Sequence, residues 1–270
     1  MSSINTNSGA LLALRNLGAA NNSVDRSLQQ TATGVKPTPA VDASSLAVGD
    51  SLESDLKAFD AVQQGLSAAT GINSAAIAGA TTVSDLLGGL REKAIAASNP
   101  ANTPEQQAAL AADFQSHLGR ITDAISNANY NGRNLISSGS QSVSLTTSVS
   151  GGQQTLANAA AIGGIPSALG GGVATPAAAA SMLTAIDAAA VVVGESLATL
   201  GANQKAVEFQ STFSKTLASA VTEGLGNLVD TNLAAEAAKL QALQVKQSLS
   251  GGTLNIANQR PQTLLSLFNT

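Results

Sequence analysis

The chain has 270 residues and a mass of 26.7 kDa; 44% of the residues are hydrophobic but only 2% are aromatic, and Trp and Cys are absent. Without Cys there are no disulfides, thiolate nucleophiles or thiolate metal ligands. The 13 basic and 17 acidic side chains give a net charge of −4, which excludes the basic surface of a typical nucleic-acid-binding protein. The core must therefore come from Ala, Leu, Val and Ile spread over long surfaces.

The first predicted helix covers about residues 1–36. Residues spaced alternately by four and three lie on one face of this helix and form a stripe along it. They are Ala10, Leu14, Leu17, Asn21, Val24, Leu28, Thr31 and Val35. Gly34 is a natural C-cap for this helix. Pro37 and Pro39 then break the helix, and residues 37–48 are predicted to form an extended linker.

A second long helix is predicted from about residue 48 to residue 98. Its apolar positions follow two heptad registers, Leu52, Leu56, Phe59 and Leu66, then Val83, Leu87, Leu90 and Ala94. Thr103, Pro104 and Gln106 form a strong start signal for a third helix, because Thr caps, Pro suits the first position and Gln completes a capping box. That helix carries one apolar face, formed by Leu110, Phe114, Leu118, Ile121 and Ile125.

The middle of the chain is free of ionisable side chains from residue 134 to residue 186. A turn is predicted at Asn131–Gly132, and the alternation over residues 141–152 predicts a short β-hairpin. The apolar stretch 162–186 is interrupted by prolines and glycines, whereas a membrane-spanning helix needs about 20 consecutive strongly apolar residues. We therefore expect a surface insert whose residues 150–175 are dispensable.

Helical spacing resumes near residue 180 and continues almost to the C-terminus, with Ser250–Gly252 as the one expected interruption. Its apolar positions include Met182, Ile186, Val193, Leu197, Leu200, Phe213, Leu217, Val221, Leu225 and Leu228. Because both ends are helical, they can pair antiparallel and leave the insert at the far tip. The predicted fold class is mainly α: a long antiparallel helical rod with terminal coiled-coil helices and a small β-hairpin or loop insert.

Candidate catalytic chemistry is scarce. His117 is the single histidine and has no Cys or second His to join it in a site, so we interpret it as a partly exposed helical side chain. Ser54–Lys57 matches S-x-x-K without its companion motifs, and we interpret it as a helix turn. We predict no catalytic residue, cofactor or metal site; an enzyme would need non-local geometry that the sequence does not reveal.

Several segments resemble bacterial flagellin in order and spacing. They are SINTNSGALLALRNL (3–17), QQTATG (29–34), LREKAIAASN (90–99), and residues 121–136, 200–209, 229–247 and 254–268. The match covers roughly residues 1–140 and 180–270, and motifs in the right order are far more specific than any one alone.

The resemblance implies a structural subunit that is exported unfolded by the flagellar type III route and polymerises into the extracellular filament for motility. The implied partners are the chain itself, the flagellar cap, junction proteins and an export chaperone, with neither nucleic acid nor membrane. The implied parts are an N-terminal inner-tube helix (1–44), a helical rod with the start of the hairpin (45–140), a variable outer insert (141–179), a returning rod (180–229) and a C-terminal inner-tube helix (230–270).

The resemblance also assigns residues to roles. The expected self-assembly interface is Leu14, Leu17, Val24, Leu28, Leu233, Leu240, Leu243, Leu249, Leu264 and Leu265, with an ordinary intramolecular core as the alternative. Flagellins often carry O-linked sugars in such inserts, and the candidate acceptors are Ser138, Ser140, Ser142, Ser144, Thr146, Thr147, Ser148 and Ser150.

A candidate receptor-facing pair is Arg91 and Glu92, which match the stretch recognised by the vertebrate flagellin-sensing Toll-like receptor. Gly88–Gly89 and Lys93 depart from that stretch, so two ordinary surface charges are the alternative. For the whole chain, the alternatives are a hook-filament junction protein, a secreted helical adhesin, or a coiled-coil scaffold without export.

Overall fold

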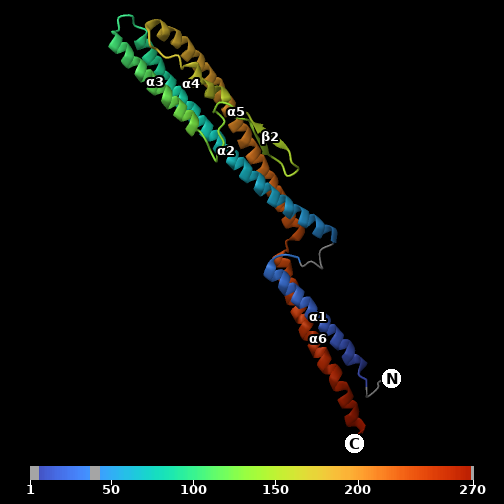
Figure 1. Ribbon diagram of the computed structural model, residues 1–270. Coiled ribbons are helices and arrows are strands. Elements are labelled where there is room, and N and C mark those ends of the chain that lie inside the picture. The colour runs from blue at the N-terminus through green and yellow to red at the C-terminus, as the bar shows by residue number, and fades with distance from the viewer. Residues whose placement is uncertain (1–5, 37–42, 269–270) are drawn as a thin grey trace. The chain divides into compact units, whose positions relative to one another are not determined.

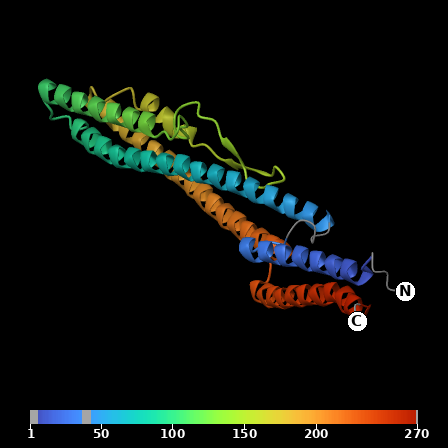
Figure 2. The ribbon, with the colours of Figure 1, turned by 90° about the horizontal axis from the view of Figure 1, so that it is seen from below.

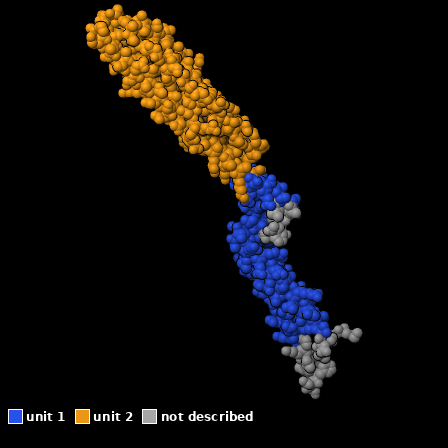
Figure 3. Space-filling model, in the orientation of Figure 1, with its two compact units in different colours: residues 1–54, 220–270 blue, residues 55–219 orange. Residues whose placement is uncertain are grey.

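The computed structural model describes residues 6–36 and 43–268, and in the second range it describes the side chains of residue 44 and residues 47–260. Within these ranges the fold is mainly α, as predicted, with one small hairpin (Figure 1). The elements are α1 (Ser8–Thr33), α2 (Ala43–Ala97), α3 (Pro104–Asn127), β1 (Val143–Thr146), β2 (Gln153–Leu156), the 3₁₀ turn η2 (Ala160–Gly164), α4 (Ile165–Ala168), α5 (Pro176–Val229) and α6 (Leu233–Phe268). The chain divides into unit 1 (residues 1–54 and 220–270) and unit 2 (residues 55–219) (Figure 3).

Unit 2 is built on α2 and α5, which lie side by side with α3 (Figures 1 and 2). The two helices are antiparallel, since the Gln63 and Asn73 side chains of α2 donate to the carbonyl oxygens of Ser211 and Leu200 of α5. Buried positions along α5 alternate by three and four: Ala179, Met182, Ile186, Ala189, Val193, Ser196, Leu200, Asn203 and Val207. The same alternation in α2 makes this a heptad seam, the packing of a left-handed coiled coil.

The third helix begins as the sequence predicts. The hydroxyl of Thr103 accepts from the Gln106 N–H at 3.2 Å, and the Gln106 side chain accepts from the Thr103 N–H at 2.9 Å, which completes the capping box. Its predicted face is buried at Phe114, Leu118, Ile121 and Ile125. The predicted turn that follows is also confirmed, because Asn131 and Gly132 have φ angles of 51° and 75°.

The hairpin differs from the prediction in its second strand. The strand β1 pairs antiparallel with β2, with Val143 opposite Leu156, so residues 141–152 hold only one strand and the turn. Gly151, at φ 84°, lies in the turn, and its N–H donates to the Ser148 carbonyl. Alternation could not reveal β2, because Leu156 is the single apolar residue of QQTL.

The expectation that residues 150–175 form an outer loop is wrong. Six apolar side chains of this segment lie in the hydrophobic core of unit 2: Leu156, Ala159, Ile162, Ile165, Leu169 and Val173. Gly163 packs so closely that a Cβ there would collide with the backbone nitrogen of Ser138. The segment closes the core beside α3 and α5 through elements too short to give a periodic signal.

Two helix boundaries also differ from the prediction. Helix α2 begins at Ala43, so residues 43–48 of the expected linker are helical, while residues 37–42 lie outside the described residues. Helix α6 runs through the expected interruption at Ser250–Gly252. A glycine inside a helix costs only about 1 kcal/mol relative to alanine, which a long packed helix tolerates.

One described helix, α5, is long and apolar enough to cross a membrane by length and composition alone. Core helices can meet the same criterion, and the buried positions of α5 follow the seam with α2. The expectation of no membrane contact stays a prediction.

Candidate functional site: the terminal helix pair

Unit 1 contains a pair of helices from the two ends of the chain. Helices α1 and α6 lie side by side and antiparallel (Figures 1 and 2), with Asn21 bonded to Gln247 and Asn7 to Ala257. The C-cap prediction is confirmed, since Gly34 is left-handed at φ 71° and its N–H donates to Gln30. The least exposed positions repeat by three and four: Ala13, Leu17, Ala20, Val24 and Ser27 in α1, and Glu236, Leu240, Leu243, Gln247, Ser250 and Leu254 in α6.

The structure divides the expected interface residues into two sets. Leu17, Val24, Leu240 and Leu243 are buried or half-buried in the seam of the pair, whereas Leu14, Leu28, Leu233 and Leu249 are exposed. Leu264 and Leu265 belong to α6, but their side chains lie outside the described residues. The seam therefore uses small residues such as Ala13 and Ala20, which allow close approach of the helices, and leaves four of the leucines outside.

The outward surface of α6 carries a second apolar stripe that sequence reasoning missed. We call it the outer stripe: Ala238, Ala242, Val245, Leu249, Gly252 and Ile256, all exposed and spaced by four and three. These positions lie across the helix from the seam positions. The heptad spacing was present in the sequence, but the prediction followed leucines alone and so found only Leu249 of this stripe.

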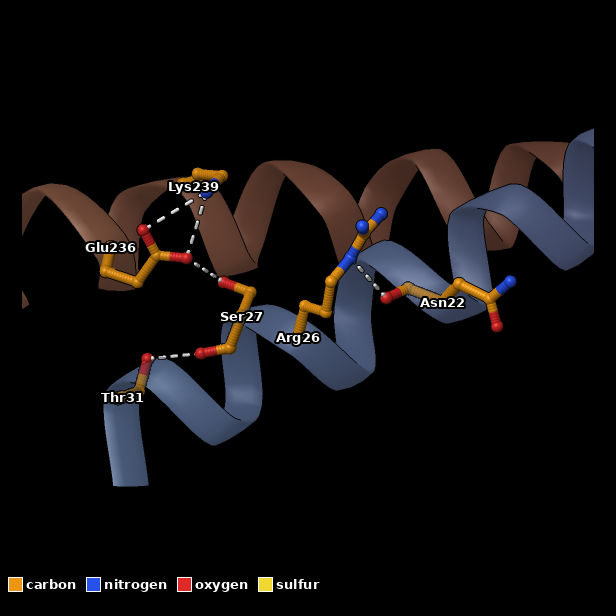
Figure 4. A network of polar contacts seen from close by, with 6 residues as sticks. All are labelled: Asn22, Arg26, Ser27, Thr31, Glu236 and Lys239. Atoms are coloured by element: carbon orange, nitrogen blue, oxygen red, sulfur yellow. Dashed lines mark hydrogen bonds and ion pairs between the residues drawn. The ribbon is translucent and has the colours of Figure 1, made fainter. Parts of the chain in front are cut away.

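A polar cluster sits inside the seam (Figure 4). The Ser27 hydroxyl donates to Glu236 Oε1 at 2.7 Å, and Lys239 Nζ lies 3.1 Å from the same oxygen. The hydrogen bond from Ser27, followed by the bond and charge of Lys239, holds the pKa of Glu236 below its ordinary value, although burial opposes the shift. A seam with a buried carboxylate and several alanines is a weak apolar core.

Asn7 joins the two helices at the end of the pair where α1 begins. Its Oδ1 caps α1 by accepting from the Ala10 N–H at 3.0 Å, and its Nδ2 donates to the Ala257 carbonyl at 2.7 Å. Pro261 lies four residues after Ala257 inside α6 and has no N–H to give that carbonyl. Asn7 therefore supplies the hydrogen bond that the proline removes.

Backbone hydrogen bonds hold the pair together at its other end, where α1 ends. Val35 bridges Asp230, the Thr231 N–H donates to the Gly34 carbonyl at 2.8 Å, and the Lys36 N–H donates to Val229 at 2.9 Å. The end of α1 and the start of α6 are thereby held together.

The candidate receptor-facing residues lie on α2. Arg91 pairs with Asp187 of α5 at 3.1 Å, and Glu92 is exposed. Gly89 departs from the stretch that the receptor recognises, and local packing explains the glycine, because a Cβ there would lie 3.2 Å from the His117 ring. A receptor role for Arg91 and Glu92 stays a prediction.

The candidate sugar acceptors surround the hairpin. Ser138, Ser142, Ser144, Thr146 and Ser150 are exposed, whereas Ser140, Thr147 and Ser148 are half-buried. Among the described residues, no group of three or more His, Asp or Glu side chains could hold a metal ion.

Comparison with known proteins gives a consistent result. The family models for the bacterial flagellin N-terminal and C-terminal helical regions match residues 4–142 and 183–268. The chain is 36% identical to flagellin FljM of Caulobacter vibrioides and 30% identical to a flagellin of Brucella melitensis, each over 99% of both chains. Its fold is similar to that of a putative flagellar hook-associated protein from Vibrio parahaemolyticus, with a TM-score of 0.58, 14% identity, and coverage of 71% of this chain and 100% of that one.

Proposed function

The chain belongs to the bacterial flagellin family and is a subunit of the flagellar filament, and we propose that it polymerises through the outward faces of the α1–α6 pair. The observation that carries this proposal is the outer stripe, together with exposed Leu11, Leu12, Leu14 and Leu28 of α1. Burying one such leucine contributes about 1.5–3 kcal/mol, so contacts with neighbouring copies can supply the stability that the polar seam lacks. In this proposal residues 1–44 and 230–270 form the inner tube.

The same weakness of the seam supports passage through an export channel. A pair that gains most of its stability from neighbours can travel unfolded and fold on arrival. We accordingly propose export by the flagellar type III route with a chaperone, folding under the flagellar cap, contact with junction proteins, and an extracellular location. The charge-free hairpin, with its exposed hydroxyls, is proposed as the surface that carries O-linked sugars.

The experiment compares two charge substitutions at equally exposed apolar positions. Leu249→Asp lies on the outer stripe at 66% exposure, and Val191→Asp lies on α5 of unit 2 at 60% exposure. Neither change buries a charge within one subunit, so both variants should keep their helicity by circular dichroism. Seeded elongation should be abolished by Leu249→Asp, because assembly would bury an unpaired charge. Normal elongation of Leu249→Asp would refute an interface at the outer stripe.

A further inference from the structure

Three of the five aromatic side chains that the structure describes are exposed. The chain has only six aromatic residues, and two of them, Phe59 and Phe114, are buried, while the side chain of Phe268 lies outside the described residues. The other three are exposed on unit 2: Tyr130 at 45%, Phe209 at 71% and Phe213 at 48%. Where such side chains lie next to one another, the contiguous apolar patch that they form marks an interaction surface.

Two of these aromatics form a ridge on α5. The rings of Phe209 and Phe213 stack with centroids 6.3 Å apart and planes 4° apart. Lys205 precedes them by four residues and Leu217 follows by four, so all four side chains lie along one line of the helix. We call Lys205, Phe209, Phe213 and Leu217 the aromatic ridge.

The third aromatic lines an open pocket on α2. The pocket has a volume of about 530 Å³ and is lined by Asp60, Gln63, Gln64, Ser67, Ala68 and Tyr130. The Tyr130 ring packs directly on Gly71, where a Cβ would lie 2.7 Å from its Cζ, and its exposed part faces the pocket. Asp60 is the one carboxylate of this tyrosine pocket.

The ridge and the pocket of one subunit face different ways. Gln63 of the pocket hydrogen-bonds to Ser211 of α5. Phe209 and Phe213 lie two residues before and after Ser211, which places them about 200° around the helix from it. The ridge therefore points away from the pocket of its own chain.

We propose that the aromatic ridge of one subunit docks into the tyrosine pocket of a second copy. A ridge and a pocket on different faces make a head-to-tail contact, and such a contact builds an open helical filament when the rotation from one copy to the next does not close a ring. The charges match as well, because Lys205 lies beside the phenylalanines and Asp60 lies in the pocket, and neither forms an ion pair among the described residues. The proposal rests on polymerisation of the chain but not on the contacts of the α1–α6 pair.

The first test removes the rings. Seeded elongation is measured for Phe209→Ala/Phe213→Ala and for the control Ile95→Ala, which trims an apolar side chain of 54% exposure on α2. Loss of two interface anchors should raise the critical concentration at least about tenfold, while the control stays near the unmodified subunit. Equal critical concentrations for all three proteins would overturn the proposal.

The second test reverses the charges. Asp60→Lys and Lys205→Asp should each slow elongation, because each places like charges together at the contact. The double variant should elongate to within about twofold of the unmodified subunit. Because all three variants change only exposed residues, failure of the double variant to recover would overturn the pairing.

The third test separates this contact from polymerisation itself. The chain has no Cys, so Asp60→Cys and Lys205→Cys subunits can be mixed, assembled and treated with a short bismaleimide. Crosslinked dimers should form in filaments and not in monomer solutions. Filaments without crosslinks would overturn the ridge and pocket contact and leave the filament function intact, whereas an unmodified chain that never elongates would overturn both.

Discussion

The hydroxyl of Ser27 donates to the carboxylate of Glu236 at 2.7 Å across the α1–α6 seam, although both side chains are more than nine-tenths buried. A buried carboxylate is tolerated only with a partner, so this bond favours one register of the two helices. It also makes the pair sensitive to pH.

Acid should weaken the pair through Glu236. The pKa of this group is lowered from its ordinary 4.5 in the folded pair, so its contribution to stability is present above about pH 4.5 and is lost as the pH falls through the folded-state pKa. The fraction of sedimentable filament should therefore fall in this acid range. The drop should be smaller for Glu236→Gln and unchanged for Asp25→Asn, an exposed acid of α1; identical acid profiles for Glu236→Gln and the unmodified chain would contradict this role.

The terminal helices should be cleaved first in the monomer. Ordering a residue costs about 1–2 kcal/mol, and burial of the alanines and polar side chains of the seam contributes little stabilisation to offset that cost. Limited proteolysis of monomer should remove residues up to about 44 and beyond about 230 before unit 2 is cut, and filaments should protect both ends. Equal protection of ends and unit 2 in the monomer would show that the pair is stable alone.

Asn7 and Pro261 should be coupled in a double-mutant cycle. Asn7→Ala removes the cap of α1, which costs about 1 kcal/mol, and also leaves the Ala257 carbonyl without its donor. Pro261→Ala restores an N–H for that carbonyl, so Asn7→Ala should cost less in the Pro261→Ala background. The stabilities of the four proteins are compared by the melting temperatures of their filaments. Strictly additive effects of the two substitutions would refute the coupling.

The segment after the hairpin should be essential to unit 2. Leu169→Ala removes a fully buried side chain and should lower the free energy of unfolding by about 2–5 kcal/mol. The matched change Val149→Ala, at an exposed position of the hairpin turn, should have little effect. Thermal unfolding of unit 2 followed by circular dichroism distinguishes them, and equal transitions would show that the segment is dispensable after all.

The fold was predictable where one signal decided it. The capping box at Thr103, the turn at Asn131 and the heptads of α2 each depend on local chemistry or strict spacing, and each is confirmed. In α1 two stripes overlap, and the prediction followed the larger leucines, Leu14 and Leu28. The buried residues are instead Ala13 and Ala20, because a two-helix seam with close backbones favours small residues.

The rest depended on contacts between distant parts of the chain. Ile162, Leu169 and Val173 are core residues because the segment folds back on unit 2. Residue spacing could not predict this packing, because the segment is too short to show a periodic pattern. Likewise the partner of Glu236 is Ser27, 209 residues away in sequence. The aromatic ridge was visible as Phe213 and Leu217 at helical spacing, but only the structure shows that it faces outward.

We expect this chain by itself to build a filament from its outward-facing terminal helices. Electron microscopy of the purified, unmodified subunit after addition of filament seeds tests it most directly. We expect long filaments that grow from the seeds, and no growth when Leu14→Asp or Leu249→Asp subunits are supplied. Unmodified subunits that only cap the seeds or remain monomeric would contradict it and would favour a junction protein or an adhesin.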